Sequence, residues 1–209
     1  MPIERSVVAV VGGGQIAIIP NAGLLFAAGA AWNPEAASES ASVDALGEVL
    51  DRRAFGGDLA PGAGRALLEL GRVAEVTGAA SPNASPLSLV LTTYPGPLPP
   101  PQAPDLTPAG LERALAQLEA ARASFPGPCT ASSEGALLAR EFRFATDALS
   151  FAGRLGLQRF ENSLGNSSLG EEALALAREH RSLWLSRSRP GGLDASAAWF
   201  ERISQGLLA

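Results

Sequence analysis

Hydrophobic residues recur every three to four positions through most of the chain beyond residue 42, and this spacing lines one face of an α-helix. The clearest example starts at Thr107 and Pro108, which suit the N-cap and the first position of a helix, and it continues to Phe125. A longer run extends from Leu137 to Leu155. The pattern therefore predicts two consecutive amphipathic helices in the middle of the chain.

Shorter runs of the same kind flank these two helices. The further ranges predicted to be helical are 42–55, 66–78, 85–91, 168–189 and 194–207. Ser168 with Glu171 three residues later matches a capping box, and Asp194 is expected to cap the last helix. The chain as a whole predicts a mainly α fold, a helical bundle of six to seven helices, with no repeat that would indicate a solenoid.

The first 35 residues have a different character. Residues 6–11, SVVAVV, are typical of a buried strand, and residues 22–32 predict a short helix that Asn33-Pro34 ends. This strand-loop-helix unit, residues 1–35, looks like one βα unit of a larger α/β fold, and residues 36–209 follow as a helical domain. A lone strand needs partners for its backbone groups. It either pairs with a segment outside this sequence or lies against the helices as an irregular arm.

A proline-rich connector, residues 94–106, interrupts the helical domain. Such a composition suits either a polyproline ligand for an aromatic groove or a stiff surface linker. We predict the surface linker, because it is by far the commoner use of such a segment.

Charge, hydropathy and cysteine content limit the partners and locations that we expect for this chain. All 16 basic residues are arginines, scattered along the chain and outnumbered by 21 acidic residues, which argues against a nucleic-acid partner. The longest apolar stretch, 16–32, is broken by Pro20 and Asn21 and is not expected to span a membrane. No secretory signal pattern opens the sequence, so we expect a cytoplasmic location, and Cys129 alone cannot form an intramolecular disulfide.

One glycine-rich motif is a candidate for cofactor binding. Residues 12–17, GGGQIA, follow the predicted strand and fit the G-x-G-x-x-A pattern of dinucleotide-binding loops. Pro20, however, falls where the second turn of the phosphate-binding helix belongs, and no second strand ends in an acid about 20 residues further on. His180, without a second His or Cys nearby, cannot form a metal site. We therefore predict no cofactor and no metal.

The stretch 178–200 contains the only His and two of the three Trp. His180 lies on the inward stripe of its predicted helix, which favours a hydrogen-bonded structural role. Four further residues have the composition of an interface hot spot: Trp184, Arg187, Arg189 and Trp199. Alternatively, both tryptophans belong to the core and the arginines are solvated near a helix C-terminus. The sequence leaves these two interpretations open.

Residues 180–193, HRSLWLSRSRPGGL, with Ser196 and Phe200 just beyond, resemble the C-terminal helical region of bacterial family 20 glycoside hydrolase-like proteins, which are related to β-N-acetylhexosaminidases. Three further segments are similar to the same family: LLFAAGAAWN at 24–33, LGEVLDRRAF at 46–55 and RALLELG at 65–71.

This resemblance implies the last βα unit of a (β/α)8 barrel followed by the C-terminal helical domain. In the family, a catalytic Asp-Glu pair comes from an earlier barrel strand, and nothing in this chain matches it. In the segment that corresponds to the family's sugar-site loop, Gln15 is the only polar candidate for substrate binding. The implied chain is inactive alone, and its partner is the missing barrel or a second copy.

The residues also fit a stand-alone helical interaction module without enzymatic activity. The two hypotheses predict different surfaces. A barrel fragment is expected to expose an apolar face where the barrel packs, whereas a stand-alone module is expected to have a closed core.

Overall fold

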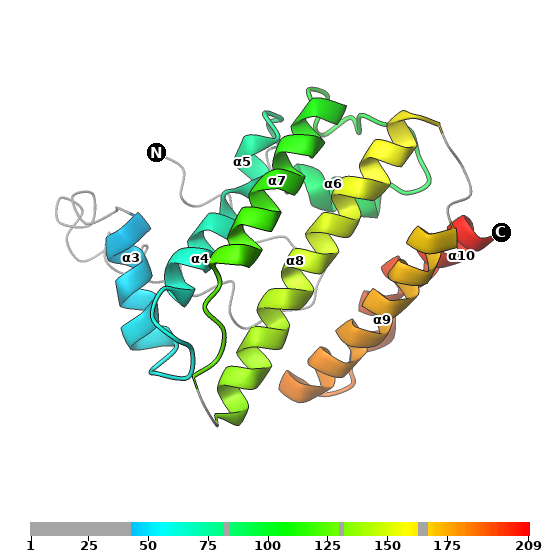
Figure 1. Ribbon diagram of the computed structural model, residues 1–209. Coiled ribbons are helices and arrows are strands. Elements are labelled where there is room, and N and C mark those ends of the chain that lie inside the picture. The colour runs from blue at the N-terminus through cyan, green and yellow to red at the C-terminus, as the bar shows by residue number, and fades with distance from the viewer. Residues whose placement is uncertain (1–42, 82–83, 130–131, 163–166) are drawn as a thin grey trace.

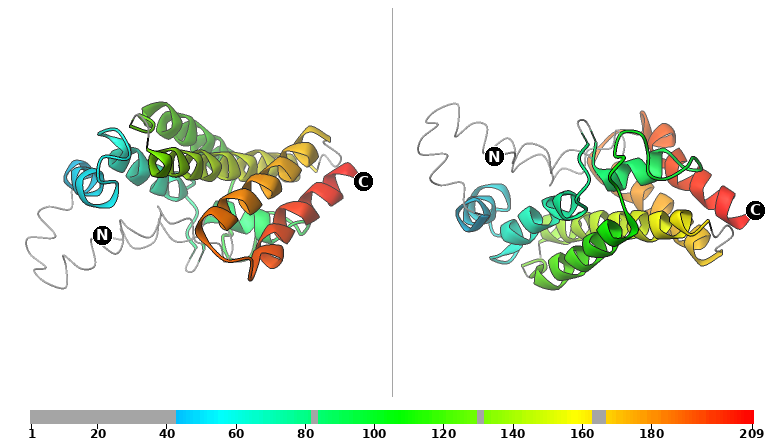
Figure 2. Two further views of the ribbon diagram at one scale, coloured as in Figure 1. Left: turned by 90° about the horizontal axis from the view of Figure 1, so that it is seen from below. Right: turned by 90° about the horizontal axis from the view of Figure 1, so that it is seen from above.

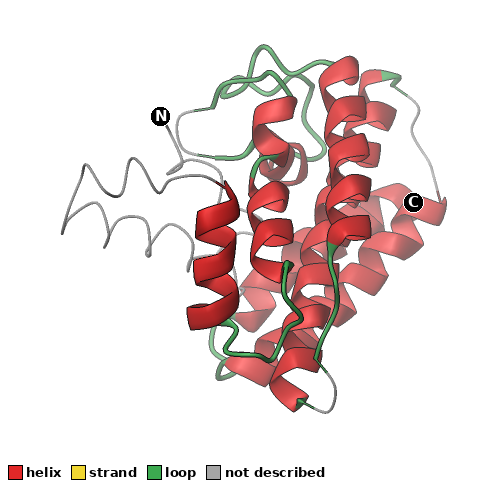
Figure 3. Ribbon diagram, turned by 60° about the vertical axis from the view of Figure 1, so that its left-hand side comes forward, coloured by secondary structure: helices red, strands yellow, loops and turns green. Residues whose placement is uncertain are grey.

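The computed structural model describes residues 43–81, 84–129, 132–162 and 167–209 (Figure 1). The predicted strand 6–11, the predicted helix 22–32 and Gln15 lie outside these residues. Within the described part, the regular elements are helices joined by loops, and one isolated β-bridge accompanies them (Figure 3). The prediction of a mainly helical chain is confirmed.

The helices follow one another closely along the described chain. Their bounds are α3 (Val43–Val49), the π-helical turn η1 (Leu50–Ala54), α4 (Ala63–Gly71), α5 (Val73–Val76), α6 (Pro86–Thr92), α7 (Pro108–Ser124), α8 (Ser133–Phe160), α9 (Ser167–Arg187) and α10 (Leu193–Leu208).

The longest helix, α8, is the centre of the bundle. Helix α7 packs along one side of α8 and α9 along the other, while α6 packs behind it (Figures 1 and 2). Helix α10 returns along α9, so that Leu208 near its end lies against Gly170 in the first turn of α9. Helices α4 and α3 extend the bundle beyond α7.

Two glycines allow α7 to approach α8 closely. A Cβ atom added to Gly153 would lie 2.8 Å from Cδ2 of Leu115, and one added to Gly156 would lie 2.6 Å from Cδ1 of Leu111. Both distances are shorter than a normal carbon–carbon contact, so a Cβ atom at either position would push the neighbouring leucine side chain aside. Leu111 of α7, which lies against Gly156, is completely buried. The α7–α8 contact is therefore a close-packed apolar interface.

The helix starts agree with the sequence in the middle of the chain and differ near its end. The side chain of Thr107 accepts a hydrogen bond from the Gly110 amide at 3.1 Å, as predicted for the cap of α7. Helix α9, in contrast, has already begun at Ser167, so Ser168 is not its cap. Gly192, with φ of 83°, precedes α10. Asp194 lies in the first turn of α10, and the prediction that it caps this helix is wrong.

The proline-rich connector is part of the packed structure. Ala103 and Leu106 are fully buried. The guanidinium group of Arg159 on α8 donates hydrogen bonds to the carbonyl oxygens of Val90 and Gly96, which holds the start of the connector against α8. Five prolines of the segment are exposed, so the connector runs over the surface of the core while its buried residues and Arg159 hold it in place. The exposed prolines are Pro95, Pro97, Pro99, Pro101 and Pro104.

One continuous apolar core extends from Leu50 to Leu207. Among the described residues, four large apolar side chains are exposed, and they are spread over α3, α9 and α10: Val49, Leu174, Leu185 and Leu208. None of the described helices combines the length and the apolar character needed to cross a membrane.

Candidate functional site

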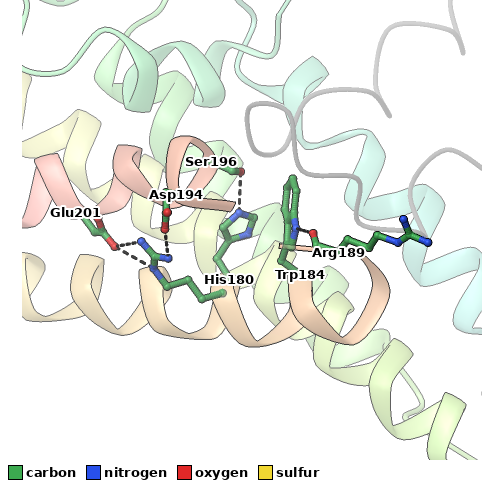
Figure 4. Close-up of polar contacts among 7 residues, drawn as sticks. His180, Trp184, Arg189, Asp194, Ser196 and Glu201 are labelled. Carbon is green, nitrogen blue, oxygen red and sulfur yellow. Dashed lines mark hydrogen bonds and ion pairs between the residues drawn. The ribbon is translucent and has the colours of Figure 1, made fainter. Parts of the chain in front are cut away.

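The residues singled out from the sequence come together mainly in the hairpin of α9 and α10. A short turn, residues 188–192, joins the two helices. The indole Nε1 of Trp184 donates a hydrogen bond to the carbonyl oxygen of Arg189 at 2.8 Å, and the Leu193 amide donates to that of Pro190 at 3.1 Å (Figure 4). Gly192 has a positive φ and lies beside the Trp184 ring. The Arg-Pro-Gly-Gly sequence therefore forms a turn of defined shape, stabilised by Trp184 from within the hairpin.

His180 is buried between the two helices. Its Nε2 atom lies 2.8 Å from Oγ of Ser196 on α10 (Figure 4). The rings of Phe144, Trp184 and Phe200 surround it at centroid distances of 5.6, 5.9 and 6.5 Å. With 3% of its surface exposed, His180 is out of reach of a substrate. The His–Ser pair therefore joins two helices and has no access for acid-base or nucleophilic chemistry.

Burial lowers the pKa of His180, and the nearby charge of Arg181 lowers it further. Both effects act in the same direction, because each disfavours a second positive charge. His180 is therefore neutral at pH 7, and its Nε2 atom donates to or accepts from the Ser196 hydroxyl according to its tautomer.

Arg181 connects the same two helices at the surface. Its guanidinium group contacts Asp194 at 2.7 Å and Glu201 at 2.9 Å (Figure 4). These hydrogen bonds raise the pKa of Arg181, with Asp194 making the larger contribution. The Asp194 side chain is 93% exposed, so this ion pair is open to water and adds little to stability.

Arg187 points back to α8 and is not solvated. Its Nε lies 2.7 Å from the carboxylate of Glu141, and its Nη1 lies 2.6 Å from that of Glu134. Hydrogen bonding to Glu141 is the main cause of its raised pKa. Glu141 is almost completely buried, so Arg187 compensates a charge inside the protein. Arg187 thus ties the end of α9 to the first half of α8.

Trp199 lies apart from the other three candidates of the predicted surface. At 100° per residue it is about 200° around α10 from Glu201, the residue that pairs with α9. The guanidinium carbon of Arg202 lies 4.3 Å above its ring. Trp199 is half-buried and Arg189 exposed. Of the four candidates, Trp184 and Arg189 are joined by a hydrogen bond, Arg187 pairs with α8, and Trp199 packs against Arg202.

Several important side chains were not recognised from the sequence. Glu141 and Glu134 are the clearest, and the sequence does contain a signal for Glu141. It follows Leu138 by three residues and precedes Ala145 by four, so it occupies the apolar stripe of α8, where an acid must have a partner. No such signal marks Glu134, which lies in the first turn of the helix.

Carboxylates between α8 and α9 are paired with arginines, as in Arg140–Glu179 and Arg154–Glu172. A glycosidase needs two carboxylates that converge on one bond, whereas each of these pairs joins one carboxylate to an arginine. Among the described residues, no group of three His, Cys, Asp or Glu side chains could hold a metal.

No family model, curated protein or solved structure matches the chain. The function is therefore inferred from the contacts of the α9–α10 hairpin and from the carboxylates that pair with arginines.

Proposed function

We propose that this chain is a non-catalytic helical domain related to the one that follows the barrel in family 20 glycoside hydrolase-like proteins. It acts by packing, and not by chemistry. The strongest support for this proposal comes from the structural role of the residues that carry the resemblance to the family. His180, Trp184 and Gly192 all serve to shape the α9–α10 hairpin.

In this proposal, residues 1–35 correspond to the last βα unit of a barrel, and the helical part provides a rigid support for it. Gln15 would face the sugar site only when the other barrel strands are present. The chain has 21 acidic and 16 basic residues, and this acidic excess is consistent with the absence of a nucleic-acid partner. Carbohydrate metabolism is then the process to which the parent protein belongs.

The experiment has two parts, both with the full chain. Incubation with a chromogenic N-acetyl-β-glucosaminide is expected to give no hydrolysis, and hydrolysis that follows the protein through purification would contradict a non-catalytic role. Size-exclusion chromatography with light scattering then compares the full chain with a variant that lacks residues 1–20. Self-association that the deletion removes would support an orphaned barrel strand.

A second candidate is a stand-alone helical interaction module. It is favoured by the scarcity of exposed large apolar side chains among the described residues, since a barrel fragment is expected to expose an apolar face. A discrete, cooperatively folded full chain that loses its fold on deletion of residues 1–20 would support this module. The sugar chemistry of the family would then be abandoned.

A further inference from the structure

A groove of about 480 Å³ lies between α8 and α9. The buried residues Phe144 and Leu176 form its apolar floor. Ala175 lines it from α9, and its methyl group leaves space that a longer side chain would occupy. The volume is within the range of about 300–1,000 Å³ found for small-molecule sites.

The acidic residues around this groove already have partners. Glu179 accepts three hydrogen bonds from Arg140, at 3.1, 3.0 and 3.1 Å, and Glu172 pairs with Arg154. Asp147 lies 2.6 Å from the guanidinium group of Arg122 on α7. The three carboxylates of the lining are therefore neutralised by arginines.

Arg143 is the exception in the lining. It lies on α8 one turn after Arg140 and therefore on the same wall of the groove. Its side chain is exposed, and no carboxylate of the described residues pairs with it. Arg143 thus places one positive charge, unpaired among the described residues, above the apolar floor of the groove. The Arg140–Glu179 ion pair joins the α8 wall of the groove to the α9 wall.

We propose that this groove binds a small organic oxyanion, either a carboxylate or a phosphate ester. The planar guanidinium group of Arg143 would bind two oxygens of the anion, a geometry for which arginine is well suited. The carbon part of the ligand would lie against Ala175 and Leu176. This site goes beyond the proposed function and does not depend on it.

The test uses NMR titration of the full chain with inorganic phosphate and, separately, with succinate, at constant ionic strength. Three variants are compared with the wild type. Arg143→Gln removes the charge, and Ala175→Leu fills the groove while Arg143 stays in place. Arg178→Gln is the control, because Arg178 is an exposed arginine of α9 outside the lining.

We expect binding in the wild type and in the control, and at least a tenfold weaker affinity in Arg143→Gln and in Ala175→Leu. Tighter binding of phosphate would assign the site to phosphate esters, and tighter binding of succinate to carboxylates. The proposal is overturned if neither probe binds, or if all four proteins bind equally, which would indicate unspecific attraction to surface arginines.

Discussion

Two helix pairs of this bundle are held together in different ways. In the α7–α8 pair, leucines pack into the spaces above Gly153 and Gly156, and the Arg122–Asp147 ion pair lies at the margin. In the α9–α10 pair, directional polar contacts of His180, Arg181 and Trp184 accompany the apolar core. Apolar packing tolerates small shifts, whereas a hydrogen bond fixes two atoms. The hairpin therefore combines directional polar contacts with close apolar packing, in which Leu208 lies against Gly170.

The largest expected effect is on the other face of α8, where the ring centroids of Phe151 and Phe200 of α10 lie 6.3 Å apart. Phe151→Ala should lower the free energy of unfolding by about 3–5 kcal/mol, because a fully buried ring leaves a cavity that the packed helices cannot close. Denaturant titration followed by circular dichroism measures it. Leu185→Ala is the control, since Leu185 is 54% exposed and should change stability by less than about 0.5 kcal/mol. Equal losses in both variants would mean that the core is not centred on α8.

A smaller loss is expected where α9 meets α8. Arg187→Met should cost about 2–3 kcal/mol, because it leaves the buried carboxylate of Glu141 without its partner. The double variant Arg187→Met/Glu141→Leu should recover most of this loss, since no buried charge remains. Arg178→Met, on the exposed side of α9, is the matched control. A double variant as unstable as the single one would show that Arg187 acts through its packing alone.

The pH dependence of the hairpin comes next. The pKa of His180 is lower in the folded protein than its ordinary value of 6.5, so the unfolded chain binds the proton more readily. The stabilisation is complete above about pH 6.5 and is lost as the pH falls toward the folded pKa. Thermal unfolding of wild type and His180→Gln between pH 5 and 8 measures it. The wild type should lose more stability than the variant on acidification; parallel curves would contradict the assignment.

The smallest effect is expected at the surface of the hairpin. Arg181→Gln should lower stability by no more than about 0.5 kcal/mol, because its partner Asp194 is almost fully solvated. The difference from the wild type should shrink further as salt is added. Chemical denaturation at low and at high salt measures the loss of stability and its dependence on salt. A loss above about 2 kcal/mol would mean that Arg181 shares in the buried contacts of the hairpin.

The local structure of the helices could be predicted from the sequence. Apolar periodicity identified α7 and α8, and Thr107 with Pro108 marked the start of α7, because these signals are local. The stripe that placed His180 inside α9 was visible for the same reason. Local patterns thus predicted the helices of the described chain well.

Contacts between distant parts of the chain could not be predicted in this way. Arg187 and Glu141 are 46 residues apart, and no local pattern pairs them. Arg159 donates a hydrogen bond to Gly96 in the proline-rich connector, 63 residues away, and no local pattern pairs these two residues. Trp199 lies at the edge of the buried face of α10 and is half-buried. The hydrophobic pattern alone does not decide whether such a ring belongs to the core or to the surface.

Native-state hydrogen exchange of the full chain at pH 7.5 tests most directly whether the hairpin is an integral part of the helical domain. The measured quantity is the free energy of exchange for amides of α9 and α10, compared with those of α8. We predict equal values away from the helix ends, because Arg187, His180 and the shared core make the three helices one cooperative unit. Exchange of the α9–α10 amides at a clearly lower free energy than those of α8 would contradict the account. The hairpin would then be a separable appendage.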